Sequence, residues 1–307
     1  MATLHHPFHE GEQAVQRLMG MQERMAEIGP RVIRDHLPEQ HQRFFAQLPM
    51  LLAGMADAQG RPWASVLVGA PGFVQAPDAQ QLRIGALPLP GDPMAGSLQA
   101  GAEIGLLGIE PATRRRNRAN GVVGAVQPDG FTVDITQSVG NCPQYIQRRV
   151  PVAPAEGAVP AGQPPQALDA LDAAAQALVA QADTLFIATR APATAERSAG
   201  GADVSHRGGP AGFVKVEDER TLLLPDYSGN QMFMTLGNLL VDDRAGLLFI
   251  DFDSGDLLTL TGRAELLWDG PDVAALDRAQ RALRFRLQAG WRLPGALPMR
   301  WRRVDGA

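Results

Sequence analysis

The sequence predicts a mainly β protein with flanking helices, an α+β chain in which two small barrels pack together as an intrachain pseudo-dimer. Three observations predict this fold class. The 33 glycines and 24 prolines supply many turns, which suit short strands better than a helical bundle. Short apolar runs separated by turn residues follow one another from residue 49 onward. Two parts of the chain also resemble each other at a fixed offset, which indicates one fold present twice.

The totals limit the classes of function. At 307 residues the chain is long enough for two domains, and it contains no apolar run long enough to cross a bilayer. The first residues, MATLHHPFHEGEQ, lack the apolar core of a secretory signal, so we expect a cytoplasmic protein without a membrane partner. A net charge of -5 argues against a nucleic-acid partner. The single cysteine, Cys142, excludes an internal disulfide.

Residues 1–47 are predicted to form an N-terminal helical segment. Within 10–28, apolar residues recur at steps of three or four, as in an amphipathic helix: Val15, Leu18, Met21, Met25 and Ile28. A second helix is expected over 38–47, opened by Pro38 in its first turn.

Residues 48–150 are predicted to form the first barrel, and 167–307 the second. Runs such as SVLVG and GFTVDITQS predict strands, with turns at 57–60 and 127–130. The stretch at 151–166, rich in proline and alanine, is expected to be a linker.

The second barrel is expected to open with an alanine-rich helix over 166–182 and to close with a helix near 271–289. Between them lie strand candidates such as TLFIATR, ADVSHR and AGLLFIDF. The segments 262–266 and 299–304 are expected to pair as its late strands.

The repeat connects the two halves. Phe73 corresponds to Phe213 and Leu82 to Leu222 at an offset of 140, and GLLGIE corresponds to GLLFID at 141. Two six-stranded barrels related by pseudo-symmetry within one chain would explain both offsets.

Polar residues gather at one corner of the second half. The run ADVSHRGGPAGFVKV places Ser205, His206, Arg207 and Gly208 where a predicted strand ends. A second cluster, PDYSGNQ, lies between a predicted strand and a helix expected over about 231–240 and contributes five further candidates: Asp226, Tyr227, Ser228, Gly229 and Asn230.

The run at 203–266 resembles the pyridoxamine 5'-phosphate oxidase-like, FMN-binding split-barrel family. FHEGE near the N-terminus and GNCPQYIQ at 140–147 resemble its two-barrel bacterial members. The resemblance implies a split β-barrel in each half, FMN held at the seam between them, and oxidoreductase chemistry. It also implies that an arginine and an aromatic residue near the C-terminus approach the cofactor, here Arg300 and Trp301.

The residues support an FMN seat independently, because FMN combines a phosphate dianion with a flat apolar ring. Arg207 offers a bidentate cation, Ser205 a hydroxyl on the same strand face, and Gly208 close backbone approach. The helix after Asn230 offers its N-terminus to phosphate.

The seat departs from the family in its cations. In pyridoxamine phosphate oxidases, an arginine and a lysine on one strand and an Arg-Lys pair at the next strand end hold the phosphate. Here Lys215 lies eight positions after Arg207, and Gly229-Asn230 replaces the pair. Pyridoxamine phosphate is therefore not the expected substrate.

The same offset predicts one flavin per chain. Of the polar set, only Ser205 has a polar counterpart in the first half, Ser65; the others correspond to apolar residues: Val66, Leu67, Ala86 and Pro90. The first barrel is expected to act as a wall over the ring.

Further candidates keep two readings each. The arginines at 114–118 form either a solvated hairpin tip or an anionic-substrate site that includes Arg116 and Arg118. Tyr145 is placed to cover the flavin or the substrate. His206 is structural, a cofactor contact or an acid/base group.

No catalytic residue can be assigned. Cys142 is expected to be a buried structural residue. His5, His6, His9 and Glu10 have the composition of a metal site, but no metal is predicted because they lie at a terminus.

The expected function is that of an FMN-dependent oxidoreductase whose partner is a small-molecule substrate or electron donor. The alternatives are a non-enzymatic carrier of flavin or haem and a structural pseudo-dimer with an empty pocket. Association of two chains into a homodimer stays open.

Overall fold

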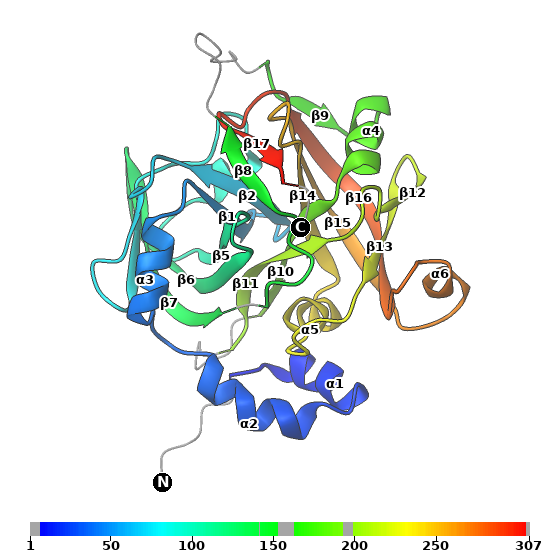
Figure 1. Cartoon of the computed structure of the whole chain (residues 1–307), viewed down its shortest axis with the longest axis horizontal. Helices are drawn as coiled ribbons and strands as arrows, with labels where there is room; N and C mark the ends of the chain where they lie inside the picture. Colours follow the sequence, from blue (N-terminus) through cyan, green and yellow to red (C-terminus); the bar gives the residue numbers. More distant parts are fainter. Residues whose placement is uncertain (1–6, 141, 153–162, 193–198, 305–307) are drawn as a thin grey trace.

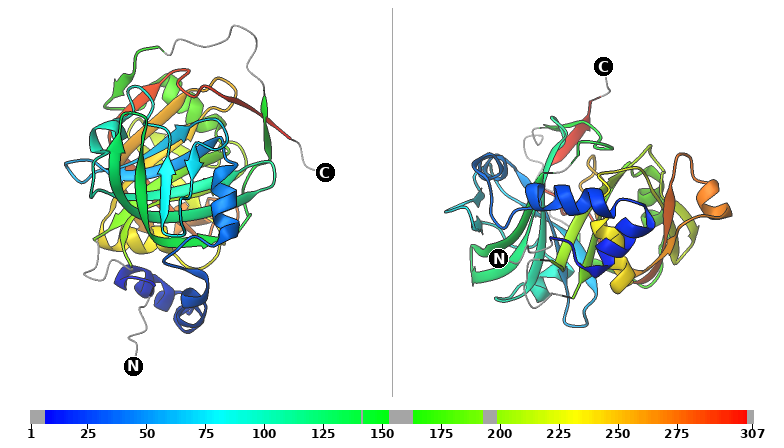
Figure 2. Two further views of the ribbon diagram at one scale, coloured as in Figure 1. Left: turned by 90° about the vertical axis from the view of Figure 1, so that its left-hand side faces the viewer. Right: turned by 90° about the horizontal axis from the view of Figure 1, so that it is seen from below.

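The computed structural model describes residues 7–140, 142–152, 163–192 and 199–304. Two large antiparallel sheets lie beside each other, and most helices lie at their ends (Figure 1). The view from below in Figure 2 separates the sheets, with the N-terminal one on the left. The protein is a mainly β molecule of two tandem split barrels, as predicted.

Barrel one is a seven-stranded sheet in the order β2-β1-β5-β6-β7-β4-β3. Its strands are β1 (Met50–Ala56), β2 (Pro62–Val68), β3 (Val74–Gln75), β4 (Gln81–Ile84), β5 (Glu103–Glu110), β6 (Arg115–Gln127) and β7 (Gly130–Gly140). The predicted turn at 57–60 joins β1 to β2: the Asp57 carboxylate accepts hydrogen bonds from the backbone of Gln59 and Arg61, and Gly60 has a φ of 74°.

Barrel two repeats this order as β11-β10-β14-β15-β16-β13-β12, with β9 added beside β16. Its strands are β9 (Gln166–Leu168), β10 (Thr184–Ala191), β11 (Gly201–Gly208), β12 (Lys215–Asp218), β13 (Thr221–Asp226), β14 (Arg244–Ile250), β15 (Leu257–Leu267) and β16 (Arg281–Leu293).

The strand registers repeat as well. Leu51 lies opposite Leu67 in barrel one, and Leu185 lies opposite Arg207 in barrel two. Since Leu67 and Arg207 are 140 residues apart, the offset seen in the sequence is the offset of the fold.

An apolar seam joins the barrels. Its buried side chains come from both sheets: Met50, Leu52, Val66, Leu107 and Ile109 from barrel one, and Phe186, Val204, Leu248, Ile250 and Leu257 from barrel two. Glycines allow the backbones to touch, because a Cβ on Gly105 would lie 2.6 Å from the Cα of Asp203, and one on Gly246 would lie 2.5 Å from the Pro62 carbonyl oxygen.

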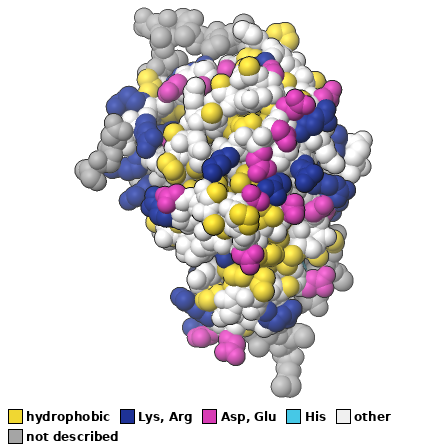
Figure 3. Space-filling view, turned by 90° about the vertical axis from the view of Figure 1, so that its right-hand side faces the viewer, with side chains coloured by type: hydrophobic (Ala, Val, Ile, Leu, Met, Phe, Trp, Pro, Cys, Tyr) yellow, Lys and Arg dark blue, Asp and Glu magenta, His cyan; other side chains and the backbone are white. Residues whose placement is uncertain are grey.

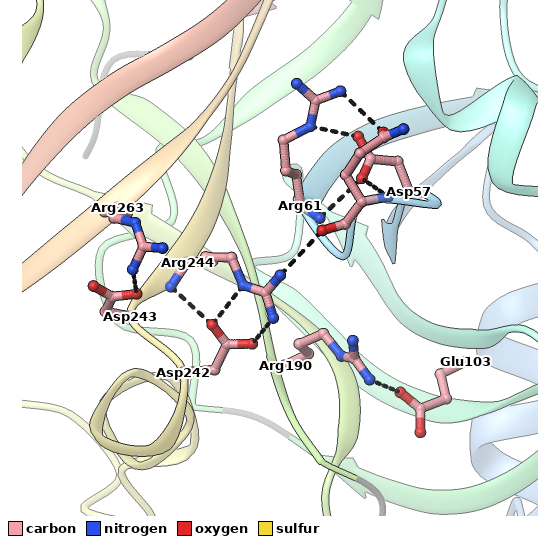
Figure 4. A network of polar contacts seen from close by, with 9 residues as sticks. Asp57, Arg61, Glu103, Arg190, Asp242, Asp243, Arg244 and Arg263 are labelled. Carbon is pink, nitrogen blue, oxygen red and sulfur yellow. Dashed lines mark hydrogen bonds and ion pairs between the residues drawn. The ribbon is translucent and has the colours of Figure 1, made fainter.

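Polar contacts cross the edge of this seam (Figure 4). Arg244 pairs with Asp242 at 2.6 Å and donates to the carbonyl oxygen of Gln59 in barrel one at 3.2 Å. Arg190 on β10 lies 3.4 Å from Glu103 on β5. These contacts tie the barrels together around the apolar seam.

The helices are α1 (Glu10–Leu18), α2 (Gln22–Val32), α3 (Glu39–Ala46), α4 (Ala173–Gln181), α5 (Met234–Val241) and α6 (Pro271–Ala274), with a 3-10 turn η1 (Pro93–Ser97). The predicted helix over 38–47 is confirmed by α3. The helix expected over 10–28 is instead two helices, because Gly20, with a φ of 67°, ends the first one. The alanine-rich helix begins later than expected, after its Asp172 cap.

The helix predicted near 271–289 is wrong. Only α6 is helical there, and β16 follows from Arg281. In the run Leu283-Arg-Phe285-Arg-Leu287 the three apolar residues are buried and the arginines between them are more exposed, so the period is two. This alternation is the signature of a strand.

The predicted pairing of 262–266 with 299–304 is also wrong. Residues 262–266 pair with β16, and β17 (Arg300–Arg303) pairs with β8 (Arg149–Val152) in a separate two-stranded sheet. Of the expected linker, 153–162 lie outside the described residues. None of the helices in the described ranges has the length and hydrophobicity to cross a membrane.

Candidate functional site

A pocket of about 850 Å³, measured with its open mouth, lies between the barrels, where β11 and α5 meet β6. It has the size of typical ligand pockets, roughly 300–1,000 Å³. The structure brings every predicted site residue to its lining: Ser205, His206, Arg207, Gly208, Asp226, Tyr227, Ser228, Gly229 and Asn230 from barrel two, and Arg116, Arg118 and Tyr145 from the first half of the chain.

Asp226 holds two arginines at one end of the pocket. Its carboxylate accepts from Arg207 at 2.5 Å and from the Nε of Arg281 at 2.9 Å. Asp226 closes β13 and lies opposite Arg281 at the start of β16, so the strand register places all three together. Two cations face one buried carboxylate here, which leaves one positive charge not neutralised.

Sequence reasoning missed Arg281 because its segment was predicted to be helical. The alternation of arginine with apolar residues after position 281 was the signal that could have placed it on a strand beside Asp226.

The N-terminus of α5 lies at the same end. Phe233 occupies the N-cap position with a φ of 60°, and no side chain caps the first amides of the helix. Phe233, Met234 and Thr235 all line the pocket. Uncapped amides and the helix dipole attract an anion.

Arg118 crosses the seam from β6. Its Nε lies 2.8 Å from the Asp203 carboxylate on β11, and both side chains are almost fully buried. Arg118 also donates to the hydroxyl of Ser205 and contacts the sulfur of Met234. Asp203 therefore neutralises and positions Arg118, and sequence reasoning missed this carboxylate because its partner lies in the other half of the chain.

Arg116, two residues earlier on β6, reaches the His206 ring. Its Nη1 lies 3.0 Å from His206 Nδ1. Burial, reinforced by the charges of Arg116 and Arg207, holds the pKa of His206 well below its ordinary value, so the ring is neutral. Of the two readings of the arginines at 114–118, the structure favours a site, because β6 already begins at Arg115 and carries Arg116 and Arg118 into the pocket.

Two tyrosines lie at the pocket. Tyr145 follows barrel one and stacks on Tyr227, with ring centroids 5.3 Å apart. Its hydroxyl donates to the backbone carbonyl of Ser228 at 2.9 Å. A Cβ on Gly208 would lie 2.2 Å from the Tyr145 carbonyl oxygen, so this close approach requires glycine.

The remaining candidates lie elsewhere. Lys215 bonds the carbonyl of Ala275, Trp301 is buried in the apolar seam, and Arg300 bonds the carbonyl of Leu297. None of the three lines the pocket between the barrels. Cys142 is a half-buried free thiol.

His9 is a structural residue. It caps α1 through a capping box with Glu12, and its Nε2 lies 2.8 Å from Asn238 on α5. His5 and His6 lie outside the described residues. Across the described ranges, no group of three or more His, Cys, Asp or Glu side chains could hold a metal ion.

The pseudo-equivalent position in barrel one is filled by apolar side chains. Val66 and Leu67 replace His206 and Arg207, and both are fully buried. Opposite Val66, the position equivalent to Arg116 is Leu257, which packs in the same apolar seam.

Comparisons with known proteins match one half of the chain. Residues 171–295 match the family model described as pyridoxamine 5'-phosphate oxidase. No curated protein matches the sequence. Among solved structures, a putative pyridoxamine 5'-phosphate oxidase from Lactobacillus delbrueckii is 16% identical, with 40% of this chain and 94% of that chain covered and a TM-score of 0.30.

Two further solved structures illustrate the range of described ligands. A FAD-binding protein from Mesorhizobium loti is 11% identical, covering 43% of this chain and 99% of its own, with a TM-score of 0.28. The heme storage protein HutZ from Vibrio cholerae is 17% identical, covering 38% of this chain and 89% of its own, with a TM-score of 0.27.

Proposed function

Residues 171–295 belong to the pyridoxamine 5'-phosphate oxidase-like split-barrel family, and from this we propose that the chain is an FMN-binding flavoprotein that acts as an oxidoreductase on a small molecule. Members of this family typically bind flavin. The substrate is proposed to differ from pyridoxamine phosphate, because Gly229-Asn230 stands where that enzyme's pattern has an Arg-Lys pair.

The observation that carries the proposal is the excess of positive charge where Asp226 meets the N-terminus of α5. Arg207 and Arg281 share the single carboxylate of Asp226, and the uncapped amides of α5 add the partial positive charge of a helix end. A phosphate monoester carries about -1.5 to -2 charges at neutral pH. It would balance this end of the pocket, whereas a neutral ligand would leave a buried cation unmatched.

Other parts of the pocket suit a flat ring. Tyr145 and Tyr227 offer stacked aromatic surface, and Phe233 and Met234 add apolar lining. The pocket is lined from both barrels, which favours a ligand that is held at their seam. When bound, a flavin supplies the redox chemistry, so the residues of the chain need only bind it, orient it and exclude water.

Outside the pocket, the surface gives no competing ligand. On the face shown in Figure 3, cationic and anionic side chains lie intermingled. Several exposed arginines of barrel two are paired with carboxylates, among them Arg284 with Glu217 and Arg263 with Asp243. Such a surface does not resemble a nucleic-acid-binding stripe.

FMN binding is tested by titrating the ligand-free chain with FMN and following flavin absorbance and fluorescence. Arg207→Gln and Arg281→Gln are each expected to weaken binding at least about tenfold, since each removes a charged hydrogen-bond donor. Arg263→Gln is the matched control, because Arg263 forms an exposed pair with Asp243 outside the pocket. No FMN binding by the wild-type chain, or a haem Soret band in place of flavin bands, would contradict the proposal.

The oxidoreductase part needs a separate test. The FMN-loaded chain is reduced anaerobically and mixed with oxygen or a quinone, and the return of flavin absorbance is followed. Reoxidation faster than that of free FMN is expected. Reoxidation no faster than free FMN, with FMN still bound, would support the carrier alternative instead.

A further inference from the structure

The pocket contains a second group of polar atoms, away from Asp226, in which Arg116 of barrel one faces His206 of barrel two. We propose that Arg116 and His206 form an oxyanion subsite that holds a carboxylate or phosphate group of the small-molecule ligand, distinct from the flavin phosphate. This inference rests on the proposed function, because it assigns the substrate class of the same pocket.

The hydrogen bond between the two residues determines the tautomer of His206. An arginine N–H can only donate, so the ring nitrogen 3.0 Å from Arg116 Nη1, which is Nδ1, must accept. The neutral ring then carries its proton on Nε2. The Phe186 ring packs against the imidazole edge-to-face at 5.7 Å and holds its orientation.

The Nε2–H donor that results has no acceptor among the described residues. His206 is 7% exposed and lines the pocket, so water does not replace a partner freely. A buried donor without an acceptor costs about 1–3 kcal/mol. A ligand oxygen at this position would remove that cost.

Arg116 differs from the other pocket arginines in its charge balance. Arg118 lies against Asp203, and Arg207 shares Asp226. In the described part of the chain, no carboxylate lies within 4.0 Å of Arg116, and its Nε is buried without a hydrogen bond.

The surroundings of Arg116 do not compensate for this. Burial lowers the pKa of Arg116 to about 10, with Arg118 and Arg207 acting in the same direction and the Cys142 thiol acting against them. The group is still a cation at neutral pH. Leaving a charge in a buried place without a counter-ion is costly, which favours an anionic ligand here.

The chemistry of the pair defines what it accepts. Both residues present only donors, so the subsite takes an acceptor without protons, as carboxylate and phosphate oxygens are, and disfavours an amine. One residue comes from each barrel, so the subsite exists only while the seam is closed.

The test uses the chain labelled with 15N at its histidines, first without FMN. Long-range 1H-15N spectra are expected to show His206 as the Nε2–H tautomer. Inorganic phosphate and acetate are then titrated separately, which tells a phosphate subsite from a carboxylate one. Either ion is expected to shift the His206 Nε2 signal saturably.

Variants decide which residues carry that binding. Arg116→Gln is expected to weaken it at least about tenfold, and Arg207→Gln is expected to weaken it less. Arg116→Met serves as a second variant if the glutamine variant does not fold, and Arg263→Gln controls for loss of surface charge. Equal loss in the Arg116 and Arg207 variants, or no saturable shift with either ion, would overturn the proposal.

FMN loading separates the two proposals. If FMN binds and phosphate or acetate still shifts His206 in the loaded chain, both stand. If FMN loading abolishes the shift, the flavin itself occupies the subsite, so the further inference fails while FMN binding holds. If the ions shift His206 but FMN does not bind, the subsite stands and the flavin proposal fails.

Discussion

Glu12 is a carboxyl group enclosed at the contact between α1 and barrel two. It accepts a hydrogen bond from the backbone of His9 at 2.8 Å, and the His9 Nε2 lies 3.5 Å away. Burial raises the pKa of Glu12 to about 8, and the Asp203 carboxylate acts in the same direction against the opposing charge of Arg118. Glu12 is therefore mostly protonated at neutral pH.

This raised pKa makes the stability of the protein depend on pH. Between pH 7 and 9 the folded state releases a proton from Glu12 that the unfolded state has already lost, so the free energy of unfolding falls as pH rises. With a folded pKa of about 8, the expected loss is about 1.4 kcal/mol. His9 does not titrate in this window, because burial lowers its pKa from the ordinary value.

Urea unfolding at pH 7, 8 and 9 checks this prediction. Glu12→Gln is expected to flatten the decline, while Glu10→Gln, an exposed change in the same helical turn, is expected to leave it in place. An equal slope in wild type and Glu12→Gln would show that another group titrates.

At the scale of elements, α1 lies directly on α5 through two glycines (Figure 1). A Cβ on Gly237 would lie 2.5 Å from the backbone nitrogen of Glu12, and one on Gly11 would lie 2.2 Å from the Gly237 carbonyl oxygen. Both obstacles are backbone atoms, which cannot move away as a flexible side chain does. The FHEGE segment therefore holds the helix whose N-terminus lines the pocket.

Gly237→Ala is expected to lower the free energy of unfolding by about 2 kcal/mol, because it separates α1 from α5. FMN affinity is expected to fall with it, since the α5 N-terminus shifts. Gly96→Ala is the matched control, because a Cβ there meets nothing within 4 Å. Chemical denaturation and FMN titration of both variants measure the two effects; equal stability of both would mean that the helices separate without cost.

Local patterns predicted the elements whose signals are self-contained. The alternation before Gly208 predicted β11, and the helical spacing around Phe44 and Phe45 predicted α3. The failures came where a neighbour decides. The segment from Arg281 is a strand because β13 and β15 lie on either side of it, and no local pattern records which strand will pair with β17.

The candidate site was predictable in part for the same reason. Ser205, Arg207 and Asn230 lie in two short runs of unusual composition, so sequence alone singled them out. The ion pairs that set the charge balance connect residues far apart in the chain. Arg118 with Asp203 spans the seam, and such pairs become visible only once both barrels are placed.

At the scale of the whole molecule, the duplication has produced two barrels with the same strand order and register but unequal seams. Arg118 donates to the backbone carbonyl of Val204, and at the equivalent place Thr259 donates to that of Ala64. The backbone geometry is thus kept on both sides, while a long cation on one side corresponds to a short hydroxyl on the other. Divergence of side chains alone separates the pocket from the filled position.

This asymmetry predicts one FMN per chain. At the position equivalent to the pocket, Val66, Leu67 and Leu257 are fully buried and packed, so a second flavin would have to displace core side chains. Each displaced leucine costs about 1.5–3 kcal/mol of burial, and no arginine stands there to bind a phosphate in return. Titration of the ligand-free chain with FMN is expected to saturate at one equivalent, and Arg207→Gln is expected to weaken that single site. Two equivalents would show that the filled position opens, and half an equivalent would show that two chains share one flavin.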